Sequence, residues 1–366
     1  SFGKRAEEHP IDDKTIYPAS LIEPLRDLIV EPNDIMGEQI LPFIPRAMEI
    51  DHTKDQRLGA FAQVMSECAS IHNAATWLAE NEEWDLLAVY YDAIDHFGHG
   101  FMEYHPPKMA HVSDRDFEIF GDVMNRVIEY HDMMLGRLLQ LVDEDTTVII
   151  LSDHGFLSDE RRPPIFIDKK TGKKVGPGMN PVAWHRAFGM VAMRGPGIKK
   201  GATITGASLL DIAPTVLAAL GLPIPSDMDG KPLLHAFDPA PTLPTIDSYE
   251  PPHPDDGMHR GEVEEDPWAA AEVVKQLAAL GYVESPEEDQ AKALERTILD
   301  RKSNLAQVHF SSGRNREAAN ALAELLEAEP KAANIRARLV MCLLVMQRFD
   351  EAEKWLEGFG HDAASE

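Results

Sequence analysis

Three short apolar runs, each next to aspartate or histidine residues, constrain the fold of this chain more than any other feature. The runs cover residues 86–91, 148–151 and 188–193. Near-continuous apolar runs of this length are typical of strands in a parallel sheet that is covered on both faces. We therefore expect buried strands at 84–91, 146–151 and 188–193, with polar side chains gathered where the strands end.

Helical patterns lie around these runs. Apolar residues recur at close to helical period over 55–80 and 114–142, and residues 209–220 predict another helix. Shorter helical stretches are expected near 20–29 and 31–44. Strands that alternate with helices predict an α/β fold with a mostly parallel sheet flanked by helices.

The polar residues beside the apolar runs form four clusters in chain order. They are Asp95–His99, Asp153–Gly155, His185–Arg186 and Asp211–Thr215. A spacing of four residues places Asp95 and His99 on one face of a helical turn. Carboxylates and imidazoles are ligand types that zinc takes, and strand ends hold such ligands rigidly. The structural alternative for each residue alone is that Asp95 caps a helix and His99 lies on the surface.

Taken together, the clusters resemble the alkaline phosphatase superfamily, and within it the type I phosphodiesterase/nucleotide pyrophosphatase branch. The resemblance is carried by D-x-x-G-H at Asp95–His99, by S-D-H-G-F at Ser152–Phe156 and by His185 ahead of a strand. It covers roughly residues 15–250 and implies an alkaline phosphatase-like fold with two neighbouring zinc ions. By this resemblance, the first zinc ion is held by Asp95, His99 and His185, and the second by Asp153 and His154.

The same resemblance implies a Thr or Ser nucleophile and a further zinc-binding Asp ahead of the D-x-x-G-H motif. Residues 1–94 contain no strand followed by an Asp-Gly turn and a nucleophile-bearing helix start, and residues 17–21 resemble the region that follows the nucleophile. We therefore expect the chain to be the C-terminal part of a longer enzyme. It then carries five metal ligands of six and no identifiable nucleophile.

Other polar residues near the clusters have expected supporting roles. Asp92 is expected to orient a ligating imidazole rather than to bind metal, and His105 to contact substrate. Arg186 is open to two interpretations, a phosphate contact or a structural salt bridge. A basic loop between the second and third runs forms either a solvated surface or a rim that attracts phosphate. Its lysines are Lys169, Lys170, Lys173 and Lys174.

Composition excludes several classes of protein. The formal net charge of −27 argues against nucleic-acid binding, and an anionic substrate would need cations at the site to reverse the local field. No apolar run approaches the length of a membrane span, and no signal peptide pattern is visible. The sequence does not decide between the cytoplasm and the periplasm. Cys68 and Cys342 are expected to be buried thiols rather than a disulfide.

The C-terminal residues resemble tetratricopeptide repeats, which implies a helical region that binds a protein partner. Corresponding residues recur after 34 positions: Leu305 and Leu339, Ala318 and Ala352, and Leu322 and Leu356. Residues 287–299 are expected to form an additional packing helix. The expected domains are an alkaline phosphatase-like domain at 1–250, a linker with a connecting helix at 251–285, and helical repeats at 286–366.

These observations favour a zinc-dependent phosphoesterase that acts on phosphodiesters or nucleotide pyrophosphates. Phosphonoacetate hydrolase and cofactor-independent phosphoglycerate mutase share the ligand types, and a sulfatase is disfavoured because the chain lacks a C-x-P-x-R motif. A hypothesis from another class is a catalytically inactive scaffold whose tetratricopeptide repeats bind a partner. The loops do not identify a substrate.

Overall fold

A computed structural model describes residues 16–249, 290–330 and 332–357 of the chain. The described residues fall into two compact units, 16–198 and 199–249 with 290–357. The predicted linker and connecting helix at 251–285 lie outside the described residues. The domain boundaries expected from the sequence stay a prediction.

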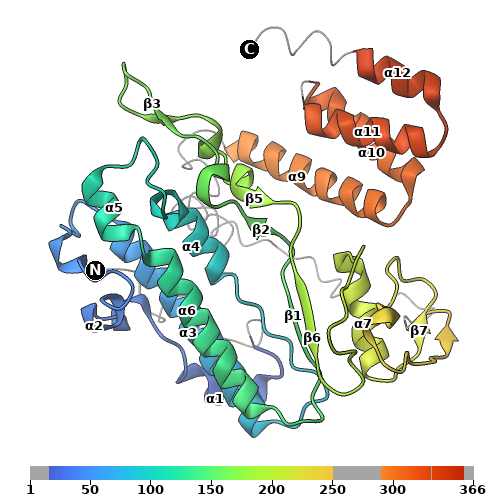
Figure 1. The fold of residues 1–366 in the computed structure, drawn as a ribbon, viewed down its shortest axis with the longest axis horizontal. Helices are drawn as coiled ribbons and strands as arrows, with labels where there is room; N and C mark the ends of the chain where they lie inside the picture. The colour runs from blue at the N-terminus through green and yellow to red at the C-terminus, as the bar shows by residue number, and fades with distance from the viewer. Residues whose placement is uncertain (1–15, 250–289, 331, 358–366) are drawn as a thin grey trace. The chain divides into compact units, whose positions relative to one another are not determined.

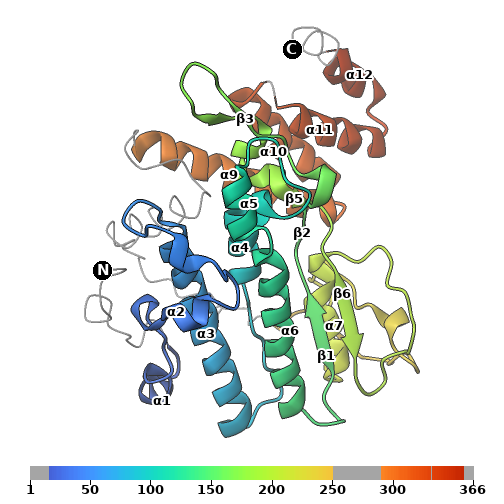
Figure 2. The same ribbon diagram turned by 60° about the vertical axis from the view of Figure 1, so that its left-hand side comes forward.

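The first unit is built around three helices that pack against one another (Figure 1 and Figure 2). They are α3 (Arg57–Asn81), α4 (Ala93–Phe101) and α6 (Val123–Leu141). The helix predicted over 114–142 is divided into α5 (Asp114–Phe120) and α6. Gly121 lies at the break, where a Cβ atom would stand 2.6 Å from the carbonyl oxygen of Phe117. Two short helices, α1 (Ile22–Arg26) and α2 (Gly37–Ile40), precede α3 in the described residues.

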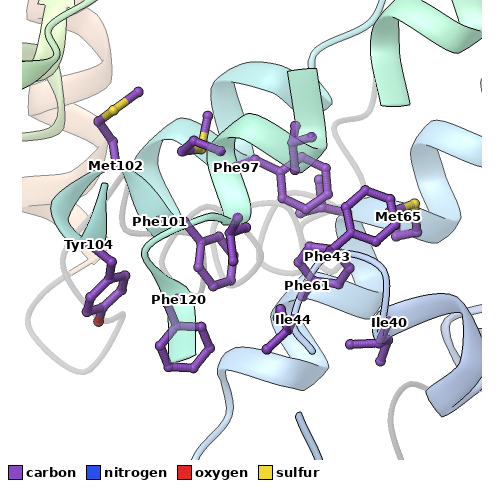
Figure 3. Close-up of a cluster of buried hydrophobic side chains, with 14 of the residues drawn as sticks. Ile40, Phe43, Ile44, Phe61, Met65, Phe97, Phe101, Met102, Tyr104 and Phe120 are labelled. Carbon is purple, nitrogen blue, oxygen red and sulfur yellow. The ribbon is translucent and has the colours of Figure 1, made fainter. Parts of the chain in front are cut away.

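Aromatic side chains from these helices form the core of the first unit (Figure 3). The ring of Phe61 on α3 lies 5.0 Å from that of Phe97 and 5.9 Å from that of Phe101, both on α4. Phe120, at the end of α5, lies 5.7 Å from Phe101. Burial of rings this large dominates the stability of such a core, so α4 is anchored firmly by one face.

The described strands form four two-stranded sheets, three antiparallel and one parallel. The antiparallel pairs are β1 (Val148–Leu151) with β6 (Val191–Arg194), β2 (Gly155–Phe156) with β5 (His185–Arg186), and β3 (Phe166–Ile167) with β4 (Lys174–Val175). The parallel pair is β7 (Ile224–Pro225) with β8 (Thr245–Ile246). An α/β domain followed by a helical tail is therefore confirmed, with small sheets in place of the large parallel sheet.

The strand predicted at 84–91 is not hydrogen-bonded as a strand to any described residue. The segment is irregular, with Leu86 and Tyr90 exposed, whereas Leu87 and Val89 are half-buried. Tyr91 hydrogen-bonds through its hydroxyl to His72 on α3. The expectation of burial on both faces is wrong for these residues, because only alternate side chains pack against the protein.

The second unit combines a short helix with a stack of longer ones. Helix α7 (Ile212–Ala219) confirms the helix expected after Asp211, whose side chain accepts hydrogen bonds from Ser208 and Lys231. The stack contains α9 (Gln290–Ser311), α10 (Asn315–Ala328), α11 (Ala333–Val345) and α12 (Phe349–Glu357). Consecutive helices of this stack pack together, and the predicted packing helix at 287–299 overlaps the first part of α9.

The two cysteines are free and buried, as predicted. Cys68 lies on α3 in the first core, and Cys342 lies on α11 among the buried leucines of the helical stack. Among the helices that the structure describes, none combines the length and the apolar composition of a membrane span.

Candidate metal centre

Helix α4 carries the first two residues of the candidate site. Asp95 lies in its first turn, where the positive end of the helix dipole favours a carboxylate, and His99 lies in its last turn. The four-residue spacing brings Oδ2 of Asp95 to 3.5 Å from Nε2 of His99. Asp95 and His99 therefore lie on one face of α4, as predicted.

The sheet of β2 and β5 positions two further histidines. Phe156 on β2 pairs with His185 on β5, and Leu157 donates a backbone hydrogen bond of 2.7 Å to the carbonyl of Trp184. His154 immediately precedes β2, so the pairing brings its ring over that of His185. The ring centroids are 3.9 Å apart with an interplanar angle of 19°.

The helix and the sheet bring their side chains to one point. Nε2 of His99 lies 2.8 Å from Nε2 of His185, and Oδ1 of Asp95 lies 3.3 Å from Nε2 of His185. One potential ligand atom from each of these three residues lies within 4.8 Å of the others. Within the part of the chain that the structure describes, this is the one group with the geometry to hold a metal ion.

The protonation states of the two clustered imidazoles suit a metal ion. Burial, together with the neighbouring His185, lowers the pKa of His99 to about 3. Burial and His154 also lower the pKa of His185. Metal ligation requires a neutral imidazole, and these imidazoles are held neutral at physiological pH. Two neutral imidazoles and one carboxylate are a donor set that fits zinc and other first-row transition metals.

The remaining two predicted ligands differ in position. Nε2 of His154 lies 3.7 Å from Oδ1 of Asp95, so His154 adjoins the cluster. The side chain of Asp153 is 63% exposed, and its Oδ1 accepts a hydrogen bond from the backbone of His154. The structure therefore gathers four of the five predicted ligands and leaves Asp153 at the solvent-exposed edge.

The predicted supporting residues have other partners. The side chain of Asp92 pairs with His96 at 3.3 Å. His105 lies 3.3 Å from the side-chain oxygen of Asn125 on α6 and 3.0 Å from the carbonyl of Pro106. Arg186 is exposed on β5 and makes no ion pair with a described residue. A substrate contact for His105 or Arg186 stays a prediction.

The basic loop divides into two parts. Lys174 on β4 donates hydrogen bonds of 2.8 and 2.7 Å to both carboxylate oxygens of Glu103. Lys169, Lys170 and Lys173 are exposed and form no ion pair with any residue that the structure describes. The loop is therefore solvated at its tip and anchored at its base, where Lys174 contacts the residue one turn beyond His99.

Sequence reasoning did not identify two groups that lie at or contact the chain just after α4, the buried Arg162 and the half-buried Glu103. Arg162 is buried and bonds to backbone carbonyls that follow α4. Glu103 lies four residues after His99 and accepts a hydrogen bond of 2.8 Å from the buried His111. The continuation of the four-residue spacing from Asp95 and His99 to Glu103 was the available signal for the second group.

Comparisons with known proteins give family matches for two parts of the chain. Residues 40–199 match the family described as "Type I phosphodiesterase / nucleotide pyrophosphatase", and residues 309–364 match a tetratricopeptide repeat. The first match contains all five predicted ligands, and the second covers the whole of α10, α11 and α12.

Two curated relatives share the name "2,3-bisphosphoglycerate-independent phosphoglycerate mutase". The protein from Cellvibrio japonicus (strain Ueda107) is 32% identical over 114 residues, which are 31% of this chain and 19% of that protein. The protein from Synechococcus sp. (strain JA-3-3Ab) is 34% identical over 113 residues, which are 30% of this chain and 20% of that protein. The chain thus matches only about a fifth of the length of these relatives.

No solved structure matches the chain. The family match at 40–199 nevertheless contains all four residues that the structure gathers on α4 and around the β2–β5 sheet. Residues 40–199 are thus similar to the type I phosphodiesterase/nucleotide pyrophosphatase family, and residues 309–364 to a tetratricopeptide repeat.

Proposed function

We propose that this chain takes part in the zinc-dependent hydrolysis of phosphate esters, with phosphodiesters or nucleotide pyrophosphates as substrates. The observation that carries the proposal is the convergence of Asp95, His99 and His185, whose ligand atoms lie within 4.8 Å of one another. The family match at 40–199 supports a phosphoryl-transfer chemistry for this site.

Asp95, His99 and His185 would hold the first zinc ion. Asp153 and His154 would contribute to a second ion beside it, in line with the resemblance of the S-D-H-G-F motif. When bound, zinc supplies positive charge that polarises a phosphoryl oxygen and stabilises the leaving oxygen. No residue of the chain is assigned as the nucleophile.

The residues of the chain prepare the site for an anionic substrate. Burial keeps His99 and His185 neutral, so both imidazoles offer lone pairs. Phe156 packs against His99 with a centroid distance of 5.1 Å and keeps one side of that ring apolar. Because the chain carries a net charge of −27, it depends on bound cations to attract a phosphate group.

A second candidate activity follows from the relatives, which are named as phosphoglycerate mutases. In that case the site would transfer a phosphoryl group between two hydroxyl groups of phosphoglycerate instead of transferring it to water. The same metal ligands would serve both reactions. The fate of the phosphoryl group therefore separates the two activities.

We also propose that the helical repeats bind a protein partner. The tetratricopeptide match at 309–364 supports this role. Leu305 on α9 and Met341 on α11 are exposed apolar residues that a partner could cover.

The test of the enzymatic proposal uses the full chain loaded with zinc. Hydrolysis of bis(p-nitrophenyl) phosphate is expected, with loss of activity after chelation and recovery when zinc is restored. His185→Ala should abolish this activity, whereas His235→Ala, at an exposed histidine outside the candidate site, should retain it. Conversion of 3-phosphoglycerate to 2-phosphoglycerate without release of phosphate would favour the mutase activity. Absence of both reactions in the zinc-loaded chain would contradict catalysis by this chain alone, and absence of bound zinc as well would contradict the enzymatic proposal.

A further inference from the structure

Arg162 is a buried cation that has no carboxylate partner among the described residues. Arg162 is 6% exposed. Its guanidinium donates hydrogen bonds to backbone carbonyl oxygens of the described residues. Burial lowers the pKa of its guanidinium, yet arginine stays charged in proteins. A buried charge of this kind is costly unless several polar groups compensate it.

The compensating carbonyls lie just beyond the end of α4. Nη1 donates to the carbonyl of Met102 at 3.0 Å and also to the carbonyl of His105, and Nη2 donates to the carbonyl of Pro107. A longer bond of 3.4 Å reaches the carbonyl of Glu103. Met102 and Glu103 belong to the short 3-10 helix Met102–Tyr104 that follows α4, and His105 and Pro107 come after it. A carbonyl oxygen has two lone pairs, so the Met102 carbonyl accepts from the backbone of His105 and also from the guanidinium.

The guanidinium also holds its own segment of chain. Its Nε donates to the carbonyl of Asp159 at 2.8 Å. Asp159 closely follows β2, whose Phe156 pairs with His185 on β5. Arg162 is thus hydrogen-bonded both to the chain that leaves α4 and to the chain that leaves β2.

These two stretches of chain carry the imidazoles of the candidate metal centre. His99 lies on α4, three residues before Met102, and His185 lies on β5 beside β2. The 2.8 Å separation of their Nε2 atoms depends on how α4 sits against the β2–β5 sheet. Besides Arg162, α4 meets this sheet at Gly98, where a Cβ atom would lie 2.9 Å from the Phe156 ring.

We infer that Arg162 is a positioning residue for the metal centre: its guanidinium fixes α4 against the β2–β5 sheet and thereby sets the separation of His99 and His185. This inference rests on the proposed metal site. A planar fork of five donors can bind several carbonyls at once, which a lysine ammonium on its flexible stem cannot reproduce. The role therefore needs arginine and not simply positive charge.

The experiment measures cobalt binding to the full chain by the visible absorption of the bound ion. Variants are Arg162→Lys and Arg162→Met, with Arg161→Met as the control because Arg161 is the exposed neighbour. Loss of a group that orients ligands typically weakens metal binding about 10- to 100-fold. We expect a loss in that range for Arg162→Met, a smaller loss with an altered spectrum for Arg162→Lys, and the wild-type constant and spectrum for Arg161→Met.

The outcomes distinguish failure of the positioning role of Arg162 from failure of the proposed metal site. If wild-type protein binds cobalt and both Arg162 variants bind it with the same constant and spectrum, the positioning role is overturned and the metal site stands. If wild-type protein binds no cobalt, the positioning role and the metal site are both overturned. Far-UV circular dichroism identifies a variant that fails to fold. Arg162→Lys, which keeps the charge, then provides the comparison with wild type.

Discussion

The Nε2 atoms of His99 and His185 lie 2.8 Å apart, although 86 residues separate them in the sequence. One imidazole comes from a helix and the other from a strand, and Oδ1 of Asp95 lies 3.3 Å from the second. Burial keeps both rings neutral. This relationship turns two sequence motifs into a single candidate metal centre.

The glycine of the D-x-x-G-H motif has a packing role. A Cβ atom at Gly98 would meet three atoms of the Phe156 ring at 2.9 to 3.1 Å, whereas a Cβ atom at Gly100 would meet nothing within 4 Å. Both glycines lie in α4, where alanine is intrinsically favoured by about 1 kcal/mol.

We therefore expect Gly98→Ala and Gly100→Ala to differ. Gly100→Ala should raise the free energy of unfolding by up to about 1 kcal/mol and leave metal binding unchanged. Gly98→Ala should weaken metal binding, because the ring of Phe156 has to move and it packs on His99. Urea unfolding and cobalt titration of both variants measure this, and equal metal affinities would contradict the packing role.

Glu103 links the metal-bearing helix to the lysine-rich loop, and its ionisation should affect stability. Burial opposes its ionisation, but the charge of Lys174 and the hydrogen bonds from Lys174 and His111 outweigh this and lower the pKa below its ordinary 4.5. A carboxyl whose pKa is lower in the folded state favours folding above its unfolded pKa. That contribution is lost as the pH falls through the folded pKa.

Glu103→Gln should therefore lower the melting temperature at neutral pH, and the difference from wild type should shrink below pH 4.5. Glu129→Gln is the control, because Glu129 is an exposed residue paired with Arg126 on the surface of α6. Surface pairs contribute little. A difference for Glu103→Gln that persists unchanged into acid would show that its ionisation does not stabilise the fold.

Phe97 anchors α4 in the core. It is 1% exposed and packs against Phe61 with a centroid distance of 5.0 Å. Truncation of a buried phenylalanine to alanine costs about 3–5 kcal/mol, so Phe97→Ala should unfold at much lower urea concentration. Phe188 is 84% exposed, and Phe188→Ala should change stability by no more than about 0.5 kcal/mol. Similar losses in the two variants would contradict the described core.

Local sequence patterns predicted the helices and the tail well. The apolar stripe over 55–80 corresponds to α3, and the four-residue spacing of Asp95 and His99 corresponds to one face of α4. The 34-residue recurrence corresponds to the tetratricopeptide match. In each case the information lies within one helix or one repeat, so no long-range contact has to be known.

The remaining features depend on contacts between distant segments. The apolar run at 86–91 does not reveal that only alternate side chains are covered. Arg162 has no sequence signal, because its partners are backbone carbonyls that any residue type can provide. The exposure of the Asp153 side chain likewise depends on how the chain turns ahead of β2. The adjacent Asp and His residues in the sequence do not predict that turn.

The central claim is that Asp95, His99 and His185 hold a metal ion, and the most direct test is the zinc content of the full chain. Elemental mass spectrometry is applied to zinc-loaded wild type, His185→Ala and His105→Ala after exhaustive dialysis. We predict that His185→Ala loses one zinc ion relative to wild type, whereas His105→Ala, whose imidazole faces Asn125, retains the wild-type content. Folded wild-type protein without zinc, or equal zinc in wild type and His185→Ala, would contradict the claim.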